Sequence, residues 1–131
     1  MRKIIILLSL LLLAGCANSI PDGFTQSRLE NEAQNIVDLL QAGQTQEVIS
    51  LMRSDVAAMI TAEQLTDVIE AKYAQVGALK ETQSFLISDT KDPSTDEVYA
   101  LVIVQVNHEK GRATYTLSFN TQYELVGLYL K

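Results

Sequence analysis

The order of two hydrophobic patterns predicts an α+β fold whose helices precede its strands. Up to about residue 77, apolar residues recur three and four positions apart, as on one face of an amphipathic helix. From about residue 82, apolar and polar residues alternate, as in half-buried strands. After an apolar leader, 116 residues remain, which is enough for one hydrophobic core. The sequence therefore predicts one domain, in which three N-terminal helices pack on one face of a four-stranded antiparallel sheet.

Two apolar stripes predict the first two helices. One stripe runs along residues 25–42, and Gly43 follows it where a left-handed cap is expected. A shorter helix is expected at 46–52, and residues 54–60 either extend it or form a separate turn. The residues expected to face the core are Leu29, Ala33, Ile36, Val37 and Leu40 in the first helix, and Val48, Ile49 and Met52 in the second.

The third helix has a recognisable signal at each end. Thr61 and Gln64 form a capping box, in which each side chain accepts a hydrogen bond from the backbone amide of the other residue. The helix is expected to run to about Val76, and Gly77 ends it. The residues expected to face the core are Leu65, Val68, Ile69, Tyr73 and Val76.

Four antiparallel strands are expected at 82–88, 98–107, 112–119 and 123–130. A hairpin turn at 108–111 joins the middle two strands, and Gly111 is expected to adopt a positive φ there. This turn sets the register of the hairpin. The expected core-facing pairs are Val102 with Leu117, Val104 with Tyr115, and Val106 with Ala113.

The outer face of this sheet is more apolar than a solvated face usually is. Its residues on the second strand are Tyr99, Leu101 and Ile103. Leu125 and Tyr129 join them if the last strand turns its other apolar residues inward. Such a belt is typical of a self-association or partner surface. The alternative is a central strand that long side chains partly cover.

The N-terminal segment has the parts of a secretory signal. Basic Arg2 and Lys3 precede an apolar run at 4–13, which is too short to span a bilayer. The run ends at Leu13-Ala14-Gly15-Cys16, which resembles the lipobox of bacterial lipoproteins. The resemblance implies cleavage before Cys16 and lipidation of its sulfur. The alternative is a free thiol in an ordinary signal peptide.

The lipobox divides the chain into three parts. Residues 1–15 are expected to be a cleaved lipoprotein signal peptide, 16–23 the lipidated N-terminus and a short tether, and 24–131 the α+β domain. Acyl chains on Cys16 would hold the domain on the extracytoplasmic face of the bacterial cell membrane. In a Gram-negative host, Ala17 favours the outer membrane, because it is not the aspartate associated with inner-membrane retention.

No group of residues in the sequence predicts catalysis or metal binding. His108 is the only histidine, and it is expected to be solvated in the predicted turn. Asp89, Asp92 and Asp96 are weak candidates for calcium ligands, and a solvated loop is the better interpretation. A nucleic-acid partner is excluded by a sequence pI of about 4.6 and by the lack of a basic stretch after Lys3. We expect a protein without enzyme activity, cofactor or metal.

Several short segments share the pattern of one domain family. They are Leu40-Gln41-Ala42-Gly43 with Val48 and Met52, Thr61-Ala62-Glu63-Gln64-Leu65, Val76-Gly77, Ser118-Phe119-Asn120, and Leu125-Val126-Gly127-Leu128-Tyr129. They resemble domain of unknown function 3887, of the nuclear transport factor 2-like (cystatin-like) superfamily. The resemblance covers about 24–131 and implies a curved sheet wrapped against helices, forming a cone with an open end. Some members precede an α/β-hydrolase domain, but without a Gly-x-Ser-x-Gly motif no hydrolase activity is carried over.

Two functional hypotheses follow. The first is a membrane-anchored, non-catalytic module that binds an envelope protein or forms a homodimer. Its candidate interface residues are Tyr99, Leu101, Ile103, Leu125 and Tyr129. The second is a small-molecule-binding or vestigial-enzyme domain that uses the cavity of the cone. Its candidate lining residues are Tyr115, Phe119 and Leu128.

Overall fold

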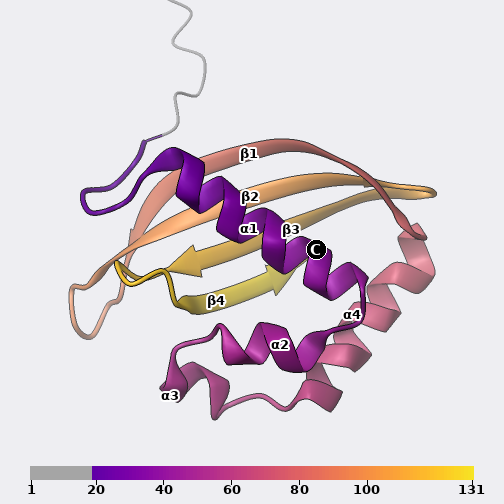
Figure 1. Ribbon diagram of the computed structural model, residues 1–131, viewed down its shortest axis with the longest axis horizontal. Helices are drawn as coiled ribbons and strands as arrows, with labels where there is room; N and C mark the ends of the chain where they lie inside the picture. Colours follow the sequence, from indigo (N-terminus) through magenta and orange to yellow (C-terminus); the bar gives the residue numbers. More distant parts are fainter. Residues whose placement is uncertain (1–18) are drawn as a thin grey trace, which may run out of the picture.

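The chain folds as helices packed on a curved antiparallel sheet (Figure 1). The computed structural model describes residues 19–131. The predicted signal peptide at 1–15 and the predicted lipidation site at Cys16 lie outside the described residues. The α+β class and the four-stranded antiparallel sheet are confirmed. None of the described helices is both long and apolar enough to cross a membrane.

The helical half has one more segment than the three helices predicted. The segments are α1 (Gln26–Gln41), α2 (Thr45–Ser50), α3 (Ser54–Ala57) and α4 (Ala62–Val76). The chain breaks between α2 and α3 because this stretch bonds to the last strand. The Leu125 N–H donates to the Leu51 carbonyl at 2.9 Å, and the Arg53 N–H donates to the Leu125 carbonyl at 3.0 Å. Residues 54–60 therefore begin a separate turn of helix rather than extend α2.

The helix ends follow their sequence signals. Gly43 has a φ of 73° after α1, as predicted for a left-handed cap. At the start of α4, the Gln64 N–H donates to Thr61 Oγ1 at 3.1 Å, and the Thr61 N–H donates to Gln64 Oε1 at 3.0 Å. Gly77 ends α4 with a φ of 79°, and a Cβ there would lie 3.0 Å from Glu109 Oε2. Only glycine fits that position without strain.

The sheet has the strand order β1-β2-β3-β4. Its strands are β1 (Leu79–Lys91), β2 (Val98–His108), β3 (Gly111–Phe119) and β4 (Leu125–Leu130). β1 extends three residues beyond each end of the predicted 82–88 strand. Its register shifts between Leu79 and Glu81 and again between Thr82 and Ser84. Such bulges break the alternation of inward and outward residues, so the sequence pattern shows only the middle of the strand.

The middle hairpin has the predicted register but a different turn. Val102 pairs with Leu117, Val104 with Tyr115, and Val106 with Ala113. Gly111 pairs with His108 in the ladder and is not among the positive-φ residues, so the predicted φ was wrong. The two turn residues, Glu109 and Lys110, bond to the segment at the end of α4. The Glu109 N–H donates to the Ala78 carbonyl at 3.0 Å, and the Lys110 N–H donates to the Val76 carbonyl at 2.7 Å.

The hydrophobic core lies between the helices and the inner face of the sheet. Its buried apolar residues all fall between Phe24 and Leu125, and Tyr115 and Phe119 are the largest that are fully buried. The partly buried Ile20 packs against this core. A chain that starts at residue 17 therefore contains the whole described core and is expected to fold without the leader.

Candidate functional site

An apolar groove of about 410 Å³ opens between β4, α4 and the α3 segment. On one side β4 contributes Val126, Leu128 and Leu130, and on the other α4 contributes Leu65 and Ile69. All ten residues that line the groove are aliphatic or methionine. Such a surface favours apolar ligands, because binding there removes apolar area from water on both partners.

Two large side chains at this groove are exposed to solvent. Met59, which follows α3, is 84% exposed, and Val68 on α4 is 56% exposed. The prediction that Val68 faces the core was wrong. Leu65 and Ile69 use the face of α4 that the sheet covers, and Val68 lies beside that face over the groove. An exposed apolar cluster of this kind is typical of a binding surface.

The three residues predicted to line a cavity of the cone have different positions. Tyr115 and Phe119 are fully buried and belong to the packed core. Leu128 lines the groove between β4 and α4. The ligand-sized space therefore lies beside the edge of the sheet, and the large aromatic residues fill the interior where the cavity was expected.

The predicted outer belt is only partly on the surface. Leu125 is fully buried, so its predicted outward position was wrong. A bulge between Ser118 and Phe119 shifts the pairing of β4 by one residue at this point, and one residue reverses the inward and outward faces of a strand. The members that remain partly or largely accessible are Leu101 and Ile103, which are half-buried, and Tyr129, which is 64% exposed.

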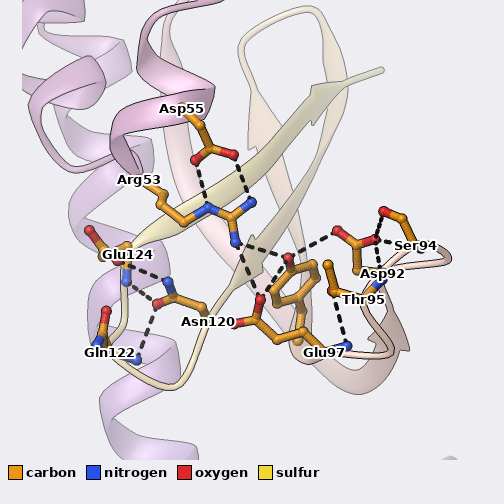
Figure 2. Close-up of polar contacts among 10 residues, drawn as sticks. Arg53, Asp55, Asp92, Ser94, Thr95, Glu97, Asn120, Gln122 and Glu124 are labelled. Atoms are coloured by element: carbon orange, nitrogen blue, oxygen red, sulfur yellow. Dashed lines mark hydrogen bonds and ion pairs between the residues drawn. The ribbon is translucent and has the colours of Figure 1, made fainter.

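Tyr99, another predicted interface residue, is buried. Its hydroxyl belongs to a polar cluster with Arg53, Asp92 and Glu97, and Figure 2 shows these three side chains converging. Arg53 Nη1 donates to the Tyr99 hydroxyl at 2.9 Å, and this hydroxyl lies 3.2 Å from Glu97 Oε2 and 3.3 Å from Asp92 Oδ2. Arg53 also donates to both carboxylate oxygens of Asp55, at 2.7 and 3.1 Å. The cluster joins the segment between α2 and α3 to the loop between β1 and β2.

Hydrogen bonds stabilise the ionised forms of the arginine and aspartate side chains in this cluster. Bonds from Arg53 hold the pKa of Asp55 below its usual value, and the bond to Asp55 raises the pKa of Arg53. Bonds from the Ser94 side chain and backbone lower the pKa of Asp92, which also accepts from the Thr95 N–H. Asp92 thus stabilises the loop between β1 and β2, in which it lies. Within residues 19–131, no group of three or more His, Cys, Asp or Glu side chains could hold a metal ion.

His108 is buried, contrary to the prediction of a solvated turn residue. It is 5% exposed, and its Nδ1 lies 2.9 Å from the Gly77 carbonyl. Its Nε2 lies 3.3 Å from the Tyr115 hydroxyl, which lies 2.9 Å from the Tyr73 hydroxyl. The turn after His108 bonds back to the end of α4. The Tyr73 and Tyr115 rings lie 5.3 and 6.4 Å from the imidazole, measured between ring centres. The sequence contained one signal, because His108 shares the even-numbered face of β2 with Val104 and Val106.

The hydrogen bonds of this buried chain have a defined direction. The Gly77 carbonyl can only accept, so Nδ1 of His108 carries a proton. In the neutral ring, Nε2 accepts from Tyr115, whose oxygen accepts in turn from Tyr73. Burial raises the pKa of both tyrosines above the ordinary phenol value. Neither phenol is thereby activated as a base. The hydrogen-bonded series of His108, Tyr115 and Tyr73 is best understood as a support for the end of α4.

A second, smaller cavity of about 270 Å³ lies where the end of α1 meets α4. Tyr73 lines it, together with Thr45, Thr66 and Glu70. The Thr45 and Thr66 hydroxyls lie 2.9 Å apart and bond to each other. This cavity is more polar than the groove, and it is the place where the buried histidine–tyrosine chain reaches a surface.

A family model matches residues 33–128, and its description is "Protein of unknown function (DUF3887)". The match covers most of the chain, including all of α2, α3, α4, β1, β2 and β3, and it ends within β4. The chain belongs to this family. No curated protein matches the chain. The family assignment of this DUF3887 chain therefore comes with no established activity.

The solved structures include a similar fold. An NMR structure of a protein from Ruminococcus gnavus ATCC 29149 matches with a TM-score of 0.73 and 20% sequence identity. The match covers 86% of the DUF3887 chain and 96% of that protein. At this identity the similarity shows a shared fold, and both chains use nearly their whole length to build it.

Proposed function

We propose that this DUF3887 chain is a lipid-anchored, extracytoplasmic, non-catalytic binding module, and that its partner binds in the apolar groove. The observation that carries the proposal is the groove itself, with Met59 and Val68 exposed over an entirely apolar lining. The arrangement of helices against a curved sheet supports membership of the nuclear transport factor 2-like superfamily.

The anchor is inferred from Leu13-Ala14-Gly15-Cys16. The Ser19 N–H already bonds to the Ile87 carbonyl of β1, at 3.1 Å. Only Ala17 and Asn18 then lie between Cys16 and the bonded Ser19, and the three residue steps from Cys16 to Ser19 span about 10 Å of extended chain. Lipidation at Cys16 would place the β1 edge against the membrane surface, of the outer membrane in a Gram-negative host. β4 and the groove lie at the opposite edge of the sheet.

Cys16→Ser is expected to abolish lipid attachment, because serine has no sulfur to carry the diacylglyceryl group. The intact mass should change from that of an acylated chain starting at residue 16 to that of an unacylated precursor. Asn18→Ser, two residues further along, is the matched control and should keep the acylated mass. An unchanged mass and unchanged membrane fractionation of Cys16→Ser would refute the anchor.

Val68→Asp tests the groove. Val68 is exposed enough for the domain to remain folded, but a carboxylate there would have to be desolvated by any apolar ligand. We expect the affinity of residues 17–131 for the dye anilinonaphthalene sulfonate to fall about tenfold, measured by fluorescence titration. Leu86→Asp, at a 39% exposed leucine of β1, is the matched control. Equal binding by both variants would contradict the assignment of the groove.

Small-molecule binding is a second candidate function. The observation that favours it is the cavity beside Tyr73, where Thr66 and Glu70 offer polar groups close to the buried histidine–tyrosine chain. The same titration separates the two functions. Dye binding that is unchanged in Val68→Asp but weakened in Tyr73→Phe would favour the polar cavity over the groove.

A further inference from the structure

The stripe of α4 that lines the apolar groove continues into a lysine. Lys72 lies one turn beyond Val68 and Ile69, on the same face of the helix. It is half-buried, whereas every other lysine between residues 19 and 131 is exposed. A half-buried lysine lays its methylene stem against apolar surface and keeps its ammonium group at the edge of that surface. Lys72 therefore brings a positive charge to the groove.

Contacts between the sheet and α4 place this charge at one end of the groove. Leu130, the last groove residue of β4, pairs with Tyr115 across the sheet. The Tyr115 hydroxyl lies 2.9 Å from the hydroxyl of Tyr73, which is the residue after Lys72. The other end of the groove lies beside α3, where Met52 forms a β-bridge to the start of β4. The groove thus runs from α3 to Lys72.

The ammonium group of Lys72 makes no ion pair or hydrogen bond within residues 19–131. No acidic residue lies three or four positions from it along α4. The α3 end is different, because Arg53 there already donates to both carboxylate oxygens of Asp55, at 2.7 and 3.1 Å. Among the described residues, the groove therefore has an unpaired positive charge at one end only.

We propose that the groove binds a free fatty-acid anion, with its carboxylate at Lys72 and its hydrocarbon chain running toward Met52 and Met59. The lining has no hydrogen-bonding side chain, so the part of the ligand that it covers must be apolar. A negative head group is favoured because it gives the Lys72 ammonium group an ionic partner. The proposal rests on the groove being the binding site and names its ligand.

The size of the groove favours one hydrocarbon chain over two. Its volume of about 410 Å³ holds roughly 14 methylene-sized groups, at about 30 Å³ each, the volume of a water molecule in the liquid. The four residue steps from Val126 to Leu130 span about 13 Å of strand, along which an extended chain can lie. A phospholipid would leave its second chain outside the groove, in contact with water. A single-chain carboxylate therefore suits the groove better than a membrane lipid.

Two methionines report on the groove directly. Met52 and Met59 both line it, and residues 17–131 contain no other methionine. Dodecanoate is titrated into this domain, labelled with ¹³C at the methionine methyl groups, and binding is followed by NMR. Both methyl signals should shift with one dissociation constant. Binding that leaves both signals in place, as in the polar cavity beside Tyr73, would overturn the proposal.

Lys72→Gln tests the carboxylate contact in the same titration. The variant keeps most of the side-chain stem but loses the charge, so dodecanoate should bind about fivefold more weakly. Lys91→Gln, at an exposed lysine of β1, is the matched control and should keep the affinity of the parent. Neutral dodecan-1-ol should bind the parent and Lys72→Gln equally. Equal dodecanoate affinities of the two variants, or an equal loss of alcohol binding, would refute the contact with Lys72.

The outcomes separate this proposal from the assignment of the groove itself. If Val68→Asp weakened dye binding but dodecanoate did not bind, the groove would remain the binding site and only the fatty acid would be refuted. Binding to phosphatidylglycerol vesicles without binding to dodecanoate would identify a membrane lipid as the ligand and would also refute the proposal.

Discussion

Leu117→Ala is expected to lower the free energy of unfolding by about 2–5 kcal/mol. Leu117 is fully buried on β3, where it pairs with Val102 on one side and Leu128 on the other. Truncation removes buried methyl groups and leaves a void that the sheet backbone cannot close. Since a domain of this size is stabilised by about 5–15 kcal/mol in total, the loss is large. Urea unfolding of residues 17–131, followed by circular dichroism, measures it.

Leu86→Ala is the control for this prediction. Leu86 is also a strand leucine, but it lies on β1 and is 39% exposed. Its truncation should cost much less, because most of the side chain is not packed. Similar losses for the two variants would mean that β3 is not at the centre of the core.

His108→Leu is expected to cost about 2–4 kcal/mol, although it keeps an apolar side chain of similar size. The change leaves the Gly77 carbonyl without its donor, and an unsatisfied buried group costs about 1–3 kcal/mol. The Tyr115 hydroxyl also loses its bond to His108, which costs about 0.5–1.5 kcal/mol, although it keeps its bond to Tyr73. Tyr73→Phe is the milder comparison, because Tyr73 is only half-buried and Tyr115 keeps its bond to His108. Thermal and urea unfolding of the same domain give both values.

A double variant separates loss of the hydrogen bond from loss of packing. Tyr115→Phe and His108→Leu each remove the bond between these two side chains. The loss of stability in the double variant should therefore be smaller than the sum of the losses in the two single variants, whereas two independent packing defects would add. Additive losses would show that the chain of hydrogen bonds does not govern this site.

Local patterns in the sequence correctly predicted the elements in which the spacing of apolar or capping residues is regular from end to end. The stripe of α1, the capping box at Thr61 and the pairing of Val102 with Leu117 all rest on unbroken spacing, and all agree with the structure. Leu125 was misplaced because the bulge opposite Ser118 and Phe119, just after Leu125 in β4, changes which residues face inward, and nothing in the local sequence marks that bulge.

The candidate site was harder to predict because the exposure of its residues depends on which distant segments pack over them and which do not. Val68 has the spacing of a core residue, and its exposure follows only from the distance between α3, α4 and β4. His108 was placed in solvent because turns are usually solvated, yet this turn is tied to the end of α4. Both outcomes depend on contacts between distant segments.

Arg53 has a consequence for the width of the groove. Its backbone N–H holds the start of β4, while its guanidinium group holds Asp55 at the start of α3 and Tyr99 at the start of β2. The wall of the groove that α3 provides is therefore fastened to the sheet by a residue outside the groove. Any event that draws the β1–β2 loop away from Arg53 would loosen that wall. Movement of this loop, which lies outside the groove, can therefore change the width of the groove.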